Sequence, residues 1–172
     1  IRHGETEPDK QNPERKLTSR GIMQMEKCSH QLVELVDRSN TVILTTSTAR
    51  TLQSSAILSK KLNLPIYHKL FKLSLGQIHP LNRMLGENNN ERNLFKFYCS
   101  LNDKGELPVG IVGSKSLIDC FLNIVTKFKT YKDLIFVGHG GVLDVIIKYQ
   151  NRFDLKKRFK GIMKYGDYVV LK

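Results

Sequence analysis

Short apolar segments alternate along the chain with longer amphipathic ones, and this alternation constrains the fold more than any other feature. The β-branched run Thr41-Val42-Ile43-Leu44-Thr45-Thr46 is typical of a buried strand, and Asp133-Leu134-Ile135-Phe136-Val137 is a second such run. We expect residues 168–171 to form a third strand and Ile1 to be the end of another. Short buried strands of this kind indicate a sheet that is covered on both faces.

Four segments have apolar residues at three- and four-residue spacing, which is typical of helices with one buried face. They lie at residues 22–36, from Thr48 to the Leu62-Asn63-Leu64-Pro65 stretch, at 117–128 and at 142–149. Strands that alternate with helices are usually parallel. The sequence therefore predicts an α/β fold, a three-layer α/β/α sandwich with a mostly parallel central sheet.

The length and composition predict one domain. A chain of 172 residues with 40% hydrophobic residues can bury a real core, so we expect a single domain over residues 1–172, with a polar insertion around 86–113. No apolar run approaches the roughly 18 residues that a membrane span needs, so we expect no membrane partner. The three cysteines are far apart and lack CxxC spacing, which argues against disulfides and zinc and favours a reducing, cytoplasmic location.

The net charge of +12 indicates an anionic partner without naming it. Nucleic acid, an anionic membrane surface, a phosphorylated small molecule and a phosphoprotein all fit such a charge. A lysine-rich composition that merely keeps the protein in solution fits equally well. Clusters such as Lys60-Lys61 and Lys156-Lys157-Arg158 come without a stacking or recognition-helix motif, so a nucleic-acid-binding module is the weaker alternative.

Three strand ends carry groups suited to phosphate. The first is Arg2-His3-Gly4-Glu5-Thr6, where a guanidinium fork precedes an imidazole that can act as nucleophile or base. The second runs from Thr46 through Arg50 into a helix, whose N-terminus attracts anions. The third is Gly138-His139-Gly140-Gly141. Ligands of open α/β sheets bind beyond the carboxyl ends of the strands, so these three places can form one pocket.

The combination resembles the histidine phosphatase superfamily, whose members have the phosphoglycerate mutase-like fold. The resemblance rests on the three motifs above and on Leu17-Thr18-Ser19-Arg20-Gly21 with Gln24, which occur in the family's order and span residues 1 to about 145. An arginine before Leu-Thr, here Arg15, and the short linker after His3 are similar to the small phosphohistidine phosphatases of this family.

The resemblance implies a phosphatase that needs no cofactor and forms a phosphohistidine on His3. Arg2, Arg50 and His139 would hold the phosphoryl oxygens. The positive neighbours should keep His3 neutral, while its other ring nitrogen donates to a backbone carbonyl. The residues expected to contact substrate around this catalytic set are Gly4, Glu5, Gly140, Lys72 and His79.

Lys72 and His79 mark a departure from the family pattern. Lys72 stands where most members have the glutamate that protonates the leaving group, and His79 replaces a second acid. An active phosphatase would then use another donor, such as His79, Glu87 or Glu5, or water. Such a loss is least harmful for phosphohistidine or acyl phosphate substrates. The alternatives are a pseudophosphatase that binds a phosphorylated partner and, less favoured, a phosphoglycerate mutase.

Overall fold

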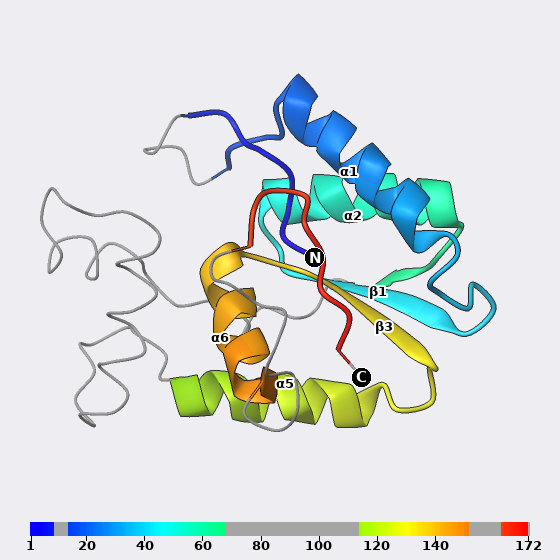
Figure 1. The fold of residues 1–172 in the computed structure, drawn as a ribbon, viewed down its shortest axis with the longest axis vertical. Coiled ribbons are helices and arrows are strands. Elements are labelled where there is room, and N and C mark those ends of the chain that lie inside the picture. The colour runs from blue at the N-terminus through cyan, green and yellow to red at the C-terminus, as the bar shows by residue number, and fades with distance from the viewer. Residues whose placement is uncertain (9–13, 68–113, 152–162, 172) are drawn as a thin grey trace, which may run out of the picture.

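The computed structural model describes residues 1–8, 14–67, 114–151 and 163–171 (Figure 1). The predicted insertion at 86–113, the positions of Lys72, His79 and Glu87, and the basic run at 156–158 lie outside the described residues. Lys60 and Lys61 are exposed in the last turn of a helix, where cations offset the helix dipole.

A parallel sheet forms the middle layer of the described part. Its strands are β1 (Thr41–Thr45), β2 (Ile66–Tyr67) and β3 (Asp133–Val137), in the order β2-β1-β3. β1 pairs in parallel with β3 over its whole length and with the short β2 on its other side. All five residues of β1 are buried, as expected for a central strand covered on both faces.

The N-terminal segment continues the sheet beyond β3. The Ile1 backbone nitrogen donates to the Phe136 carbonyl at 2.7 Å, and the His3 N–H donates to the Gly138 carbonyl at 3.1 Å. Arg2 forms a parallel bridge with Gly138. Residues 1–3 therefore run alongside the end of β3, and the pairing continues past Ile1 to His3.

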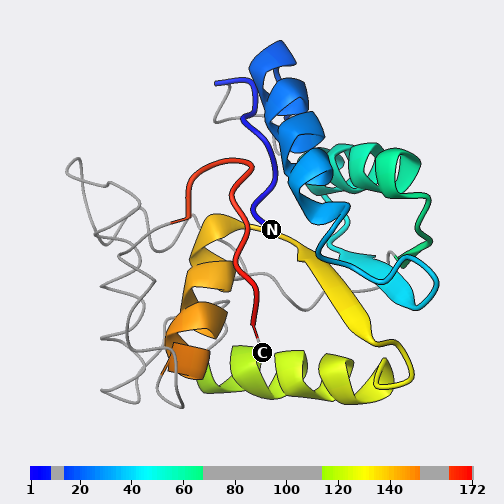
Figure 2. The same ribbon diagram turned by 45° about the vertical axis from the view of Figure 1, so that its right-hand side comes forward.

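Helices cover both faces of this sheet. α1 (Ser19–Leu32) and α2 (Ala49–Leu62) lie on one side, and α5 (Ser114–Lys127) and α6 (Gly140–Asn151) lie on the other (Figures 1 and 2). The predicted three-layer α/β/α arrangement is confirmed, and each helix overlaps the segment expected from its apolar spacing.

The ends of α1 and α2 follow from local chemistry. The Thr18 hydroxyl accepts a hydrogen bond from the Gly21 N–H at 3.0 Å, so it caps the N-terminus of α1. α2 ends at Asn63, whose φ of 55° lies in the left-handed region that stops a helix. Pro65 follows shortly after and could not continue the helix.

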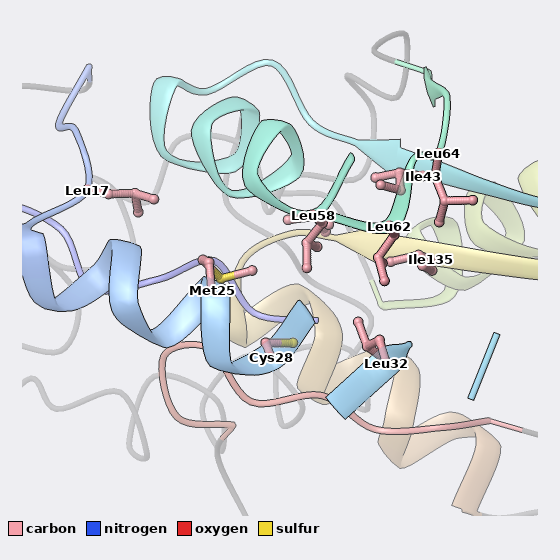
Figure 3. Close-up of a cluster of buried hydrophobic side chains, with 10 residues drawn as sticks. Leu17, Met25, Cys28, Leu32, Ile43, Leu58, Leu62, Leu64 and Ile135 are labelled. Carbon is pink, nitrogen blue, oxygen red and sulfur yellow. The ribbon is translucent and has the colours of Figure 1, made fainter. Parts of the chain in front are cut away.

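The main core fills the space between the sheet and the pair α1 and α2 (Figure 3). Successive strand residues point to opposite faces. Ile43 therefore faces α1 and α2, whereas Val42 and Leu44 pack with Phe128 on the other face. The side chains of the main core are Leu17, Met25, Cys28, Leu32, Ile43, Leu58, Leu62, Leu64, Ile135 and Val137.

The predicted strand at residues 168–171 is wrong. The segment forms no strand and pairs with none of the described strands. Tyr168 packs against the main core, and Leu171 packs against a small cluster of Leu143, Ile147 and Met163. Val170 is 53% exposed. A β-branched composition supplies strand propensity, but a strand also needs a neighbouring strand with which to form a ladder.

Within the described residues, no helix is both long and apolar enough to cross a membrane.

Candidate active site

The imidazoles of His3 and His139 lie side by side at the carboxyl end of the sheet. Arg2 pairs in parallel with Gly138, so the residues that follow each of them are neighbours across two adjacent backbone segments. The ring centroids are 5.3 Å apart and the ring planes are inclined by 71°. This separation is close to the spacing of about 4.8 Å between neighbouring strands. The backbone pairing itself thus brings the two imidazoles together.

His3 is buried, and one of its ring nitrogens has a fixed partner. The side chain is 6% exposed, and Nδ1 lies 2.7 Å from the Gly4 carbonyl oxygen. A carbonyl can only accept a hydrogen bond, so Nδ1 donates and carries the proton. The lone pair of the neutral ring is then on Nε2. The sequence predicts that a backbone carbonyl accepts this hydrogen bond but does not say which one. In the structure it is the carbonyl of Gly4.

The environment keeps His3 uncharged at neutral pH. Burial lowers the pKa of His3 to about 4, against the opposing effect of the hydrogen bond to Gly4, and the charges of Arg50, Arg2 and Arg15 lower it further. The predicted direction is therefore confirmed. The prediction relied on positive neighbours, however, whereas burial is the largest cause.

His139 has the same kind of environment. Burial, followed by the charge of Arg50, holds the pKa of His139 well below its usual value. Its Nε2 lies 3.4 Å from the Thr46 hydroxyl, which donates in turn to the Thr51 hydroxyl at 2.9 Å. A network of hydroxyl groups at the end of β1 thus lies beneath this imidazole.

The Arg2 guanidinium is held on several sides. It is 5% exposed, and its Nη1 donates to the Met163 carbonyl at 2.6 Å. Its central carbon lies 3.9 Å from the centroid of the Tyr165 ring. A Cβ at Gly140 would lie 3.1 Å from the guanidinium atoms, so the glycine at this position allows the close approach.

Arg50 lies in the first turn of α2, where a positive charge is unfavourable for its own helix. The side chain is half-buried. Burial and then the charge of Arg15 lower the pKa of Arg50, whereas Glu14 raises it. Its charge also lowers the pKa of both His3 and His139, so Arg50 lies within electrostatic range of the two imidazoles.

Gly4 and Glu5 have structural contacts. A Cβ at Gly4 would overlap the Gly21 carbonyl, so this glycine lets the loop approach α1. The Gly4 N–H donates to the Ser54 hydroxyl at 3.2 Å. The Glu5 carboxylate accepts from the Thr18 hydroxyl at 3.2 Å and lies 3.7 Å from Arg20. These contacts attach the loop to α1, and a contact of Glu5 with substrate stays a prediction.

Two residues join this site that were not among the expected site residues. Arg15 adds a charge that acts on both histidines, and only its place before Leu17-Thr18 gave a signal. Tyr165 contacts Arg2 and His3 from near the C-terminus, and no motif marked it. Among the residues that the structure describes, no group of three or more His, Cys, Asp or Glu side chains is placed to hold a metal ion.

Comparison with known proteins finds a family match in the N-terminal part of the chain. Residues 1–73, which contain Arg2, His3, Arg15 and Arg50, match the profile of the histidine phosphatase superfamily (branch 1). The N-terminal part of the chain is thus similar to the histidine phosphatase superfamily. No curated protein gives a significant sequence match to this chain.

Solved structures of low sequence identity share the fold. The α-ribazole phosphatase from Shigella flexneri is 21% identical with a TM-score of 0.62, over 96% of this chain and 85% of its own. A mycobacterial glucosyl-3-phosphoglycerate phosphatase is 14% identical with a TM-score of 0.61, and the match covers 88% of this chain and 77% of that protein. A protein assigned as the phosphohistidine phosphatase SixA from Agrobacterium tumefaciens is 13% identical with a TM-score of 0.54, and the match covers 90% of this chain and 74% of that protein.

Proposed function

We propose that this protein hydrolyses a phosphomonoester or a phosphohistidine through a covalent phosphohistidine on His3. One observation carries the proposal: His3 is a buried, neutral imidazole whose Nδ1 donates to the Gly4 carbonyl. The lone pair on Nε2 is then available as a nucleophile beside three arginines that favour an anion.

The first step transfers the phosphoryl group to His3. The Nε2 lone pair attacks phosphorus, and the bond from phosphorus to the leaving oxygen or nitrogen breaks with its electrons going to that atom. Arg2, Arg50 and His139 hold the three remaining phosphoryl oxygens. Their cationic and N–H groups supply the charge stabilisation that a metal ion supplies in other phosphoryl-transfer enzymes.

The second step regenerates the imidazole. Water attacks phosphorus, the bond between phosphorus and Nε2 breaks, and the electron pair returns to the ring as inorganic phosphate leaves. The hydrogen bond from Nδ1 to Gly4 is stronger while the ring is positively charged, so it stabilises the phosphohistidine.

The leaving group also takes up a proton. Glu5 is already engaged by Thr18 and Arg20, and the other candidate donors, His79 and Glu87, lie outside the described residues. A positioned general acid typically contributes about 10²–10⁴ in rate. A phosphohistidine substrate depends least on such an acid, so it is the substrate class that this site would hydrolyse fastest. The structural neighbours have names that point to different substrates, which share only the phosphoryl group.

The first test concerns the nucleophile. His3→Ala should abolish hydrolysis of p-nitrophenyl phosphate and the trapping of labelled phosphate on the protein. His30→Ala is the matched control, because His30 is an exposed histidine on α1. A His3→Ala variant that retains full activity would show that the nucleophile assignment is wrong.

Arg50→Ala tests the phosphate site and should raise KM and lower kcat together. A panel that contains phosphohistidine protein, sugar phosphates and phosphoglycerates then separates an enzyme from a pseudophosphatase. Binding of these compounds without release of phosphate would favour the pseudophosphatase, whereas faster hydrolysis of phosphohistidine than of alkyl phosphates is the expected result.

A further inference from the structure

Tyr165 lies in the candidate site although it belongs to none of the sequence motifs. Its ring centroid is 3.9 Å from the central carbon of the Arg2 guanidinium and 5.5 Å from the centroid of the His3 ring. An aromatic face at this distance from a guanidinium gives a cation–π interaction. Tyr165 therefore contacts Arg2 and His3, two residues of the first motif, although it lies more than 160 positions later in the chain.

The segment that carries Tyr165 is fixed to Arg2 by the backbone. The Arg2 N–H donates to the Asp167 carbonyl at 3.0 Å, and the Gly166 N–H donates to the Arg2 carbonyl at 3.2 Å. The Met163 carbonyl accepts from Arg2 Nη1, and the Met163 N–H donates to the buried Asp144 carboxylate at 3.1 Å. The turn thus holds both the main chain and the side chain of Arg2.

Gly166 allows this turn to approach α1. Its φ is 75°, in the region that favours glycine, and a Cβ at this position would lie 2.8 Å from the Gln24 Cβ. The turn therefore packs closely against α1, while its backbone hydrogen bonds to Arg2 keep Tyr165 beside the guanidinium.

We propose that Tyr165 is a positioning residue of the phosphoryl site, whose ring holds the Arg2 guanidinium in the orientation that binds phosphoryl oxygens beside His3. This inference rests on the proposed phosphatase function. A guanidinium binds phosphate with two parallel N–H groups in one plane, so the orientation of that plane determines whether both bonds can form. A ring on one face and the Met163 carbonyl at one edge fix this plane before substrate binds.

The same side chain also acts on the second arginine of the site. Tyr165 raises the pKa of Arg50, so the phenol group lies within electrostatic range of that guanidinium. The groups that face His3 are thus Arg2, Arg15 before α1, Arg50 on α2, His139 at α6 and Tyr165 on the C-terminal turn.

The test compares Tyr165→Leu, which removes the π face, with Tyr165→Phe, which keeps it. We expect Tyr165→Leu to lower kcat/KM for p-nitrophenyl phosphate at least about tenfold, because a small misplacement of a binding group is costly. KM should rise, and the Kd of inorganic phosphate measured by calorimetry should weaken about as much. Tyr165→Phe should restore both values to within about threefold of the wild type.

Two further readouts separate positioning from loss of structure. A sample with some unfolded protein would lower kcat alone and leave KM and the phosphate Kd unchanged. In Tyr165→Leu, His3 loses part of its burial and of the nearby Arg2 charge, and both of these lower its pKa. The acidic limb of the pH profile of kcat/KM should therefore move to higher pH in Tyr165→Leu and stay in place in Tyr165→Phe. Tyr168→Leu is the matched control, since Tyr168 lies on the same segment but packs against the core.

Tyr165→Leu that folds and keeps the wild-type KM, phosphate Kd and acidic limb would overturn the proposal. If Tyr165→Leu does not fold in a thermal melt, Tyr165→Met replaces it, with the same expectations. The phosphate Kd also distinguishes the two proposals. A wild-type protein that hydrolyses nothing but binds phosphate, with binding lost in Tyr165→Leu and kept in Tyr165→Phe, would refute the proposed hydrolysis and support the role of Tyr165.

Discussion

Gly140→Ala should separate activity from stability, because this glycine faces the Arg2 guanidinium. A Cβ at Gly140 would lie 3.1 Å from Cζ, Nε and Nη1 of Arg2, so the guanidinium would have to move by a few tenths of an ångström. Arg2 cannot move freely, since its Nη1 is bonded to Met163 and its face lies on Tyr165. The displacement should therefore reach the phosphoryl site.

The expected loss follows from this displacement. A misplacement of 1 Å can cost about 10²-fold in rate, so a few tenths of an ångström should cost roughly three- to tenfold in kcat/KM. Stability should fall much less than activity. Gly140 is the first residue of α6 and its φ is not positive, so alanine fits the backbone, and its higher helix propensity offsets part of the cost of displacing Arg2.

Gly138→Ala is the control from the same motif. A Cβ there would meet only the Leu143 side chain at 3.8 Å, which is an ordinary contact. Both variants are assayed with p-nitrophenyl phosphate and by thermal unfolding. Equal activity of the two variants, or a loss of activity in Gly140→Ala matched by a lower Tm, would refute the reasoning that Arg2 is displaced.

Three more predictions concern pH and packing. The free energy of unfolding should fall as pH drops from 6.5 towards 4, by up to about 1.4 kcal/mol per pH unit for each of His3 and His139. The reason is that these histidines take up protons in the unfolded chain at a higher pH than in the folded protein, where burial lowers their pKa. Urea titrations at several pH values measure the effect, and a flat profile would contradict it. Gly21→Ala should lower both Tm and activity, since its Cβ would overlap the Glu5 backbone beside the His3 loop. Met25→Ala should cost about 2–5 kcal/mol of stability in denaturant melts, because Met25 is fully buried, with the phosphate Kd unchanged.

Local patterns were sufficient to predict most of the fold. β1 and β3 were visible because a buried parallel strand has apolar residues on both faces, and Asn63 before Pro65 indicated the end of α2. The segment at 168–171 has the same composition but forms no strand among the described residues. Strand formation depends on which segment lies next to it, and composition does not contain that information.

The site was predictable only where it lies in motifs. His3, Arg50 and His139 each follow a strand end, so their convergence follows from the parallel sheet. Tyr165 was missed because its place depends on the return of the chain to Arg2 after α6, which no local pattern specifies. The dominant role of burial in the pKa of His3 was missed for the same reason, since burial results from packing by distant segments.

The separation of the two imidazoles is fixed by main-chain hydrogen bonds, and this has a consequence for heat inactivation. Residues 1–3 are held to β3 through the bonds of Ile1, His3 and Gly138, at the outer side of that strand. Short hydrogen-bonded ladders open more easily than the long ladders between central strands. Opening of this short ladder would move the imidazole of His3 away from that of His139 while the helices and the central strands remain folded. Inactivation on warming should therefore coincide with faster amide exchange at His3 and precede the loss of helical circular dichroism.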